Sequence, residues 1–210
     1  MPLEEPSDDG KIHVVEKGFS TTTDGSGGNM ITFGILFENT SKFVAHPAEI
    51  RLNMLDASGE RIDVEKWELD TSVPTIMPGQ RFGIGGDVYN SGKTKLAKLG
   101  VTVEETKWWP LDNYAIEFED ITADNVRVKG SDRDASGAVS FTIHSPYDEP
   151  MGGVAFAIFR DHSGRIVGGT DEGDWVDTKY PPGTSRGKIK VDHRMPPKLD
   201  GSRTEVYVAP

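Results

Sequence analysis

The densest group of acidic side chains in this sequence lies in one short segment and comprises Asp171, Glu172, Asp174 and Asp177. Hard cations such as Ca²⁺ bind six to eight oxygen ligands, and a loop with several carboxylates beside a glycine could supply part of that shell. The segment lacks both the alternating acidic positions and the closing glutamate of a calcium-binding loop. We therefore expect a solvated hairpin tip here, with a cation site at these four carboxylates as the alternative.

Two adjacent tryptophans, Trp108 and Trp109, form the second group with a possible binding role. Neighbouring side chains on a strand point to opposite faces, so both rings cannot enter one core. The rings could pack between two domains, or they could form an exposed platform that stacks on a sugar ring or a peptide, because tryptophan is enriched at binding hot spots. Packing between domains is the favoured role, and these two residues are the predicted binding residues.

Motifs for catalysis are incomplete in this chain. Gly92-Lys93-Thr94 resembles the end of a phosphate-binding loop, but the required preceding glycine is replaced by Asp87. The five histidines are dispersed without metal-chelating spacing. The absence of cysteine excludes disulfides, thiolate nucleophiles and iron–sulfur ligation by cysteine. We predict no catalytic residues and no cofactor, and we expect a protein that is not an enzyme.

The elements that would carry these residues follow a strand pattern. Apolar side chains alternate with polar ones at Phe33, Ile35 and Phe37, and no window sustains the 3.6-residue apolar period of a helix. Ala155 to Phe159 is a nearly continuous apolar run, and Arg160 is inserted after it, so the inward phase of this run is ambiguous and a bulge is one explanation. The content of 24 glycines and 13 prolines suits many tight turns. The sequence therefore predicts an all-β protein.

The strand pattern occurs twice. Four pairs of landmarks lie 106, 105, 104 and 105 residues apart, namely Phe37 and Ile143, Asp56 and Asp161, Pro78 and Pro182, and Val103 and Val208. Offsets this steady predict a tandem duplication, and strands every 8 to 12 residues or so with turns between them favour two tandem immunoglobulin-like β-sandwich domains. The expected organisation is a flexible acidic tail at 1–10, a first sandwich at 11–106, a linker at 107–114 and a second sandwich at 115–210.

A family resemblance rests on the same residues. The first copy has polar Asn39-Thr40-Ser41 after a strand, then Leu52-x-Met54-Leu55-Asp56-x-x-Gly59, then Pro78-Gly79. This order resembles the FxLYD-type domains of bacterial exported proteins and lipoproteins, although the second copy has lost the asparagine and gained a residue. The resemblance implies a location at the cell envelope and a role in binding or assembly, with no family-wide catalytic residues.

Charge and hydropathy limit the partners. The formal net charge of −11 makes nucleic acid and anionic membranes poor partners, and no apolar run is long enough to be a transmembrane segment. The acidic start, with two prolines and no export signal, fits either a cytoplasmic protein with a frayed terminus or an exported protein whose signal or lipid anchor has been removed.

The expected function is that of a non-enzymatic, envelope-associated or secreted protein that binds a partner protein or a cell-wall polymer. One alternative is a carbohydrate-binding module that uses exposed tryptophans. The second alternative is a hydrolase on an all-β scaffold, which would need a cleft with convergent histidines and carboxylates.

Overall fold

The computed structural model describes residues 11–24, 26–62, 64, 70–73, 75–91, 94–112, 119–172 and 179–209, and these residues form an all-β structure. In the described part of the chain, no helix has both the length and the apolar composition needed to cross a membrane. The strands are β1 Ile12–Thr23, β2 Asn29–Asn39, β3 Val44–Leu55, β4 Asp70–Val73, β5 Arg81–Asn90, β6 Lys98–Trp109, β7 Thr122–Lys129, β8 Gly137–Ser145, β9 Met151–Gly152, β10 Val154–Arg160, β11 Ile166–Asp171, β12 Lys179–Tyr180, β13 Gly183–Val191 and β14 Glu205–Ala209.

The first half of the chain forms two antiparallel three-stranded sheets, ordered β1-β2-β5 and β4-β3-β6. The predicted alternation is confirmed here, because Phe33, Ile35 and Phe37 of β2 share a core with Leu52 and Met54 of β3. Burying the apolar faces of two sheets against each other is the main stabilising contribution in such a sandwich.

The second half repeats this order, with sheets β13-β8-β7 and β11-β10-β14 and a short β12-β9 pair. The registers also correspond: Arg51 of β3 lies opposite Thr102 of β6, and Phe156 of β10 lies opposite Tyr207 of β14, 105 residues further along in both strands. The repeat found in the sequence is thus matched by a repeat in strand order and register.

The predicted turns also adopt one geometry in the two halves. Asp56 Oδ1 accepts hydrogen bonds from the Ser58 backbone amide (2.8 Å) and hydroxyl (2.6 Å), and Asp161 Oδ1 accepts the same pair from Ser163 (2.9 and 2.6 Å). The following glycine has a φ of 90° in the first turn and 88° in the second, a conformation that costs glycine little. The Asp-x-Ser-Gly spacing therefore fixes this hairpin tip locally, through its own side chains.

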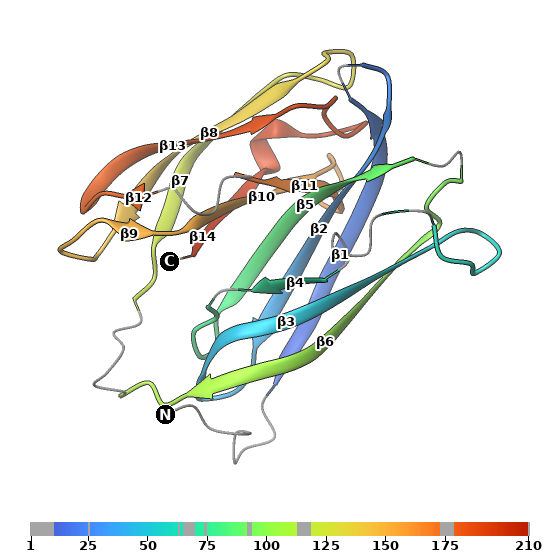
Figure 1. Ribbon diagram of the computed structural model, residues 1–210. Coiled ribbons are helices and arrows are strands. Elements are labelled where there is room, and N and C mark those ends of the chain that lie inside the picture. The colour runs from blue at the N-terminus through green and yellow to red at the C-terminus, as the bar shows by residue number, and fades with distance from the viewer. Residues whose placement is uncertain are drawn as a thin grey trace.

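The two halves pack face to face in four layers (Figure 1). The middle layers are β1-β2-β5 and β11-β10-β14, whose outer faces contact each other through β11 against β2 and β5 and through β10 against β5. Glycines line this junction: a Cβ at Gly34 would lie 2.6 Å from Gly168 O, and a Cβ at Gly169 would lie 2.6 Å from Gly85 Cα. The backbones of the two sheets therefore touch where side chains would normally hold sheets about 10 Å apart.

This packing explains the continuous apolar run in β10. Ala155, Ala157 and Phe159 belong to the core of the second half, whereas Phe156 belongs to the core of the first half and Ile158 contacts β2 and β11. Both faces of the strand are buried, so the run has no polar face to mark its phase. A register shift does occur at Arg160 in the pairing of β10 with β11.

Candidate functional site

The two tryptophans lie on β6, which continues through Trp109 into the range predicted as a linker. Trp108 is only 5% exposed and belongs to the core of the first half, while Trp109 is half-buried and its Nε1–H donates a hydrogen bond to His46 O at 2.9 Å. Their side chains do point to opposite faces, as the strand geometry predicts. The structure thus gives Trp108 a core position, where its ring is not available for stacking on a sugar.

A small apolar hollow of about 420 Å³ lies next to the end of β6. Its lining includes Phe43, Pro110 and Leu111, and Leu111 is 58% exposed. An apolar surface at this edge is therefore formed by Pro110 and Leu111, which follow the tryptophans in the chain, together with Phe43.

The acidic segment is only partly described. Asp171 ends β11, and Glu172 accepts a hydrogen bond from the Tyr180 hydroxyl at 2.6 Å; Asp174 and Asp177 lie outside the described residues. Burial first, and then this bond to Glu172, raise the pKa of the Tyr180 phenol well above its ordinary value. Among the residues that the structure describes, no three potential metal ligands gather in one place. Glu172 acts as the acceptor for Tyr180.

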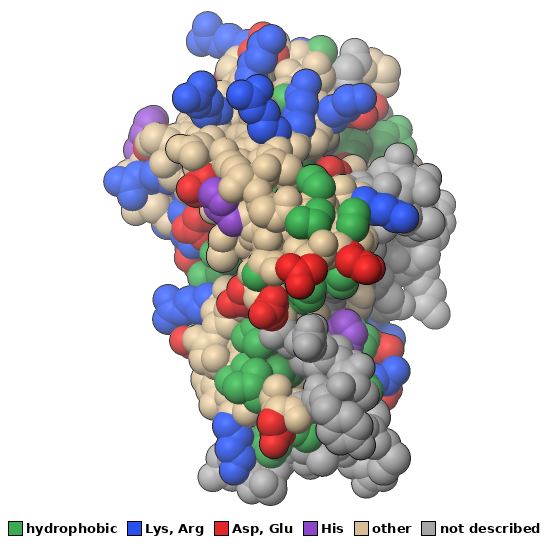
Figure 2. Space-filling view, turned by 90° about the vertical axis from the view of Figure 1, so that its left-hand side faces the viewer, with side chains coloured by type: hydrophobic (Ala, Val, Ile, Leu, Met, Phe, Trp, Pro, Cys, Tyr) green, Lys and Arg blue, Asp and Glu red, His purple; other side chains and the backbone are tan. Residues whose placement is uncertain are grey.

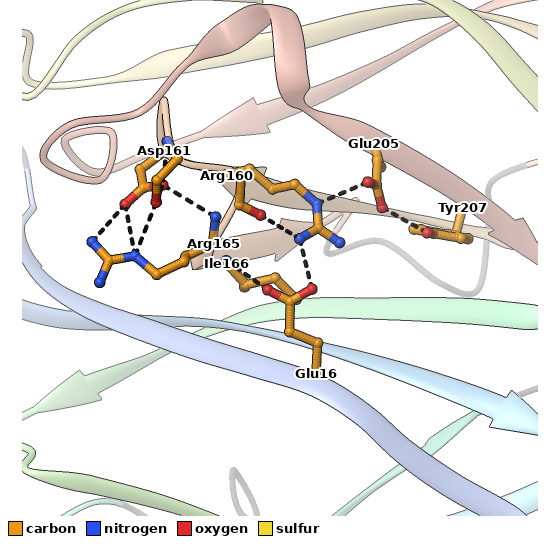
Figure 3. Close-up of polar contacts among 9 residues, drawn as sticks. Glu16, Arg160, Asp161, Arg165, Ile166, Glu205 and Tyr207 are labelled. Atoms are coloured by element: carbon orange, nitrogen blue, oxygen red, sulfur yellow. Dashed lines mark hydrogen bonds and ion pairs between the residues drawn. The ribbon is translucent and has the colours of Figure 1, made fainter.

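A polar network crosses the junction between the halves (Figure 3). Arg160 at the end of β10 is 12% exposed in its side chain, and its guanidinium donates to Glu16 of β1 at 2.7 Å and to Glu205 of β14 at 2.8 Å. The second oxygen of Glu16 accepts the Ile166 backbone amide at 3.1 Å, and Tyr207 donates its hydroxyl to Glu205 at 2.7 Å. Every member is thus paired, as a nearly buried charge requires.

The network also sets the protonation of its members. Burial alone lowers the pKa of Arg160, but the hydrogen bonds to Glu205 and Glu16 and the charges of both carboxylates raise it above its ordinary value. Burial and the hydrogen bond to Glu205 raise the pKa of the Tyr207 phenol well above its ordinary range. Arg160 therefore stays charged and Tyr207 stays protonated near neutral pH, and the network joins β1, β10 and β14.

A second polar contact of the junction involves His193, which is 3% exposed. Its Nδ1 lies 2.8 Å from Arg194 O, and its Nε2 lies 3.6 Å from the Asp87 carboxylate of β5 without a hydrogen-bond partner in the described part of the chain. The adjoining backbone pairs with the end of β1, because Arg194 N donates to Thr23 O at 2.8 Å. This histidine therefore joins the segment after β13 to the first half.

The outer face of the β13-β8-β7 sheet carries a concentration of cations that is unexpected in so acidic a chain. Basic side chains gather at the upper end of the molecule in Figure 2, where Figure 1 places this sheet. The register places Lys188 and Arg127 on either side of Ser140 of the central strand, and Arg186 beside Thr142. The exposed basic residues of the two outer strands are Arg127, Lys129, Arg186, Lys188 and Lys190.

These five side chains, which we call the basic face, form no ion pair and no side-chain hydrogen bond with any residue that the structure describes. Asp124, an acidic side chain on the same face, contacts His144, whose Nε2 lies 3.2 Å away, and the Asn125 amide at 2.8 Å. Between the basic strands lies a hollow of about 670 Å³ whose lining includes Ser140 and Thr142.

The polar network, His193 and the basic face were not predicted from the sequence. One signal was present for the junction, because Gly83, Gly85 and Gly86 within one predicted strand indicate a close approach of another backbone. The basic face had a signal too, since Arg186, Lys188 and Lys190 alternate with other residues along one strand and so must share a face. No signal in the sequence pointed to Arg160 or His193, because their partners lie far away in the sequence.

No protein-family model matches this chain, and no curated protein matches it significantly. The likeness to FxLYD-type domains therefore stays a prediction from the sequence.

Proposed function

We propose that this chain is a non-enzymatic, envelope-associated or secreted interaction protein, built from two tandem immunoglobulin-like domains of the FxLYD type. The proposed partner is a protein or a cell-wall polymer. The repeated strand order and register support the tandem arrangement, and a two-sheet antiparallel sandwich of three or four strands a sheet is the architecture of such domains.

One observation carries the binding role: the outer face of β13-β8-β7 is a polar, cation-bearing sheet surface whose basic side chains have no described partner within the chain. A scattered set of lysines would be ordinary, but five like charges on one small face repel one another and favour association with something of opposite charge.

Fractionation and binding of the full-length chain test this proposal. We expect the protein in the envelope or secreted fraction of its source cells, and we expect the purified chain to cosediment saturably with washed cell walls or to retain an envelope protein on a column. The variant K95S/K98S removes two exposed lysines of the first half, away from the basic face, and it should bind like the unchanged chain. A chain found only in the cytoplasmic fraction, with no retention by walls or envelope proteins, would contradict the proposal.

A further inference from the structure

We propose that the basic face binds a linear anionic glycan, a polymer of hydroxylated units that carries a carboxylate or phosphodiester on successive units. This inference rests on the proposed function and narrows its partner to one chemical class. The outer strands β13 and β7 supply the cations, and the central strand β8 supplies hydroxyl groups between them.

The spacing of the charges suits a polymer better than a small anion. Arg186, Lys188 and Lys190 occupy alternate positions of β13, so successive side chains are about 7 Å apart along the strand. Arg127 and Lys129 lie on β7, which is two strands away from β13 in the sheet. The second row of charge is therefore about 10 Å from the first. Two parallel rows of this kind attract a chain that lies between them along β8.

The floor between the rows offers hydrogen-bonding groups. Ser140 and Thr142 project from the outer face of β8, and the hollow between the strands also reaches Asn125. Thr142 lies 3.4 Å from the Asn125 amide, and Asn125 holds the positive φ of 51° that turns it out of the strand at a bulge. Neutral hydroxyls and amides between two rows of cations match the hydroxyls and the anionic groups of a glycan chain.

The face favours a glycan over single-stranded nucleic acid. Proteins that bind single strands stack bases on exposed aromatic rings. Phe141 is the only phenylalanine, tyrosine or tryptophan on the three strands, and its ring is buried on the inner side beneath Gly187. The outer face of a sheet also lacks the protruding element that enters a duplex groove.

The basic residues are not explained by protection of the sheet edges alone. Lysine on an edge strand discourages pairing with another chain. Protection of that kind does not require hydroxyl groups, whereas here β13 carries three cations at alternate positions and the hydroxyl-bearing hollow lies between the charged strands.

Binding of the full-length chain to defined polymers tests the inference. The probes are polygalacturonate, which carries carboxylates, and a lipid-free glycerol-phosphate polymer, which carries phosphodiesters; neutral dextran and an oligo(dT) strand complete the set. We expect saturable binding to at least one anionic polymer at 50 mM salt, weaker binding as the salt concentration rises, and no binding to dextran. The variant R186S/K188S should bind about tenfold more weakly or worse, because two of the five charges are gone.

The control K95S/K98S removes the same charge from an exposed surface elsewhere and should bind like the unchanged chain. Because all four side chains are exposed, thermal unfolding should confirm that both variants stay folded. The charge-preserving variant R186K should retain most of the binding.

Three results would overturn the inference: no binding to either anionic polymer, equal losses in R186S/K188S and in the control, or tighter binding to oligo(dT) with the same dependence on Arg186 and Lys188. Failure here is distinguishable from failure of the proposed function. If R186S/K188S is retained on cell walls as well as the unchanged chain is, the basic face is not the binding site, but the proposed envelope role stands. If the chain binds the polymers but is retained neither by walls nor by envelope proteins, the basic face is a binding site and the proposed envelope role is wrong.

Discussion

Individual polar residues at the junction show how this fold tolerates charge in its interior. Arg160 is nearly buried, yet each of its charged partners lies within hydrogen-bond distance and comes from a different strand. Removing one of these glutamates leaves the nearly buried guanidinium with a single charged partner, which destabilises the fold. The network therefore stabilises one alignment of β1, β10 and β14 relative to shifted alignments, in which Arg160 would lose its partners.

His193 differs from Arg160 because its charge depends on pH near neutrality. Burial lowers its pKa, but the nearby Asp87 carboxylate, the Arg194 carbonyl and the charge of Asp192 act in the opposite direction, so the pKa lies above its ordinary value. A raised pKa in the folded state means that the protonated imidazole stabilises the fold. That contribution is fully present below the ordinary pKa of about 6.5 and is lost as the pH rises through the folded-state value.

We predict that the variant H193Q unfolds more easily than the unchanged chain at pH 5.5 and that this difference shrinks as the pH rises to 8.5. Denaturant unfolding at a series of pH values measures the difference directly, since the titration of all other groups is common to both proteins. The variant H13Q, at an exposed histidine outside the junction, is the control. A difference between H193Q and the unchanged chain that stays constant or grows with pH would refute this account.

At the scale of elements, the glycines of β5 and β11 decide how the two middle sheets meet. A Cβ at Gly85 would lie 2.5 Å from Thr170 N and closer still to Ala157 O, and backbone atoms cannot move aside as the end of a side chain can. Glycine normally weakens a strand by its extra backbone freedom. In β5 that cost is offset because only glycine lets the sheets come into backbone contact.

The variant G85A tests this balance between two opposing effects. Alanine at a strand position should stabilise the protein by about 0.4–1 kcal/mol through the unfolded chain. Overpacking at the junction should cost about 1–3 kcal/mol or more, so we expect a net loss in the free energy of unfolding. Thermal or denaturant unfolding provides the measurement.

The matched control for that experiment is G100A in β6. Its new Cβ would meet the Asn53 side chain at 3.0 Å, within the first half and away from the junction. We expect a smaller change there than in G85A. A G85A protein as stable as the unchanged chain would mean that the sheets are not in backbone contact.

At the scale of the whole molecule, the two halves share buried side chains. Val154, Phe156 and Ala209 from the second half belong to the same core as the first half, and the ring of Phe82 lies 6.0 Å from that of Phe156 in an edge-to-face arrangement and 5.5 Å from that of Tyr207. Aromatic contacts of this geometry add to the stabilisation from apolar burial. Separating the halves would expose part of a core that both of them need.

We therefore predict that the chain unfolds in one cooperative transition and not in two. Scanning calorimetry should give a calorimetric enthalpy close to the van't Hoff enthalpy. The variant G85A should lower the midpoint temperature of this single transition without splitting it in two. Two well-separated transitions in the unchanged chain would show that the halves are stable independently and that the shared core contributes little.

Several features could be read from local sequence, because neighbouring residues cause them. The Asp-x-Ser-Gly turns form their hydrogen bonds within four residues, and the Pro-Gly turns place Gly79 and Gly183 at the same φ of 72°. The alternation of Phe33, Ile35 and Phe37 marks a strand with one face in a core. The environment of Trp108 could not be read in the same way, since where β6 ends depends on its pairing with β3.

Local sequence is enough to predict that this protein is all-β, that its strand pattern repeats at about 105 residues and that its turns are specified by their own residues. Which faces of the repeated sheets meet could be seen only in the folded molecule. The packing of these two faces buries both sides of β10, brings Arg160 to Glu16 across the junction and leaves the basic face of β13-β8-β7 exposed. The physical reason is that strand periodicity encodes an apolar face, whereas contact between two sheet faces depends on surfaces assembled from residues distant in the chain.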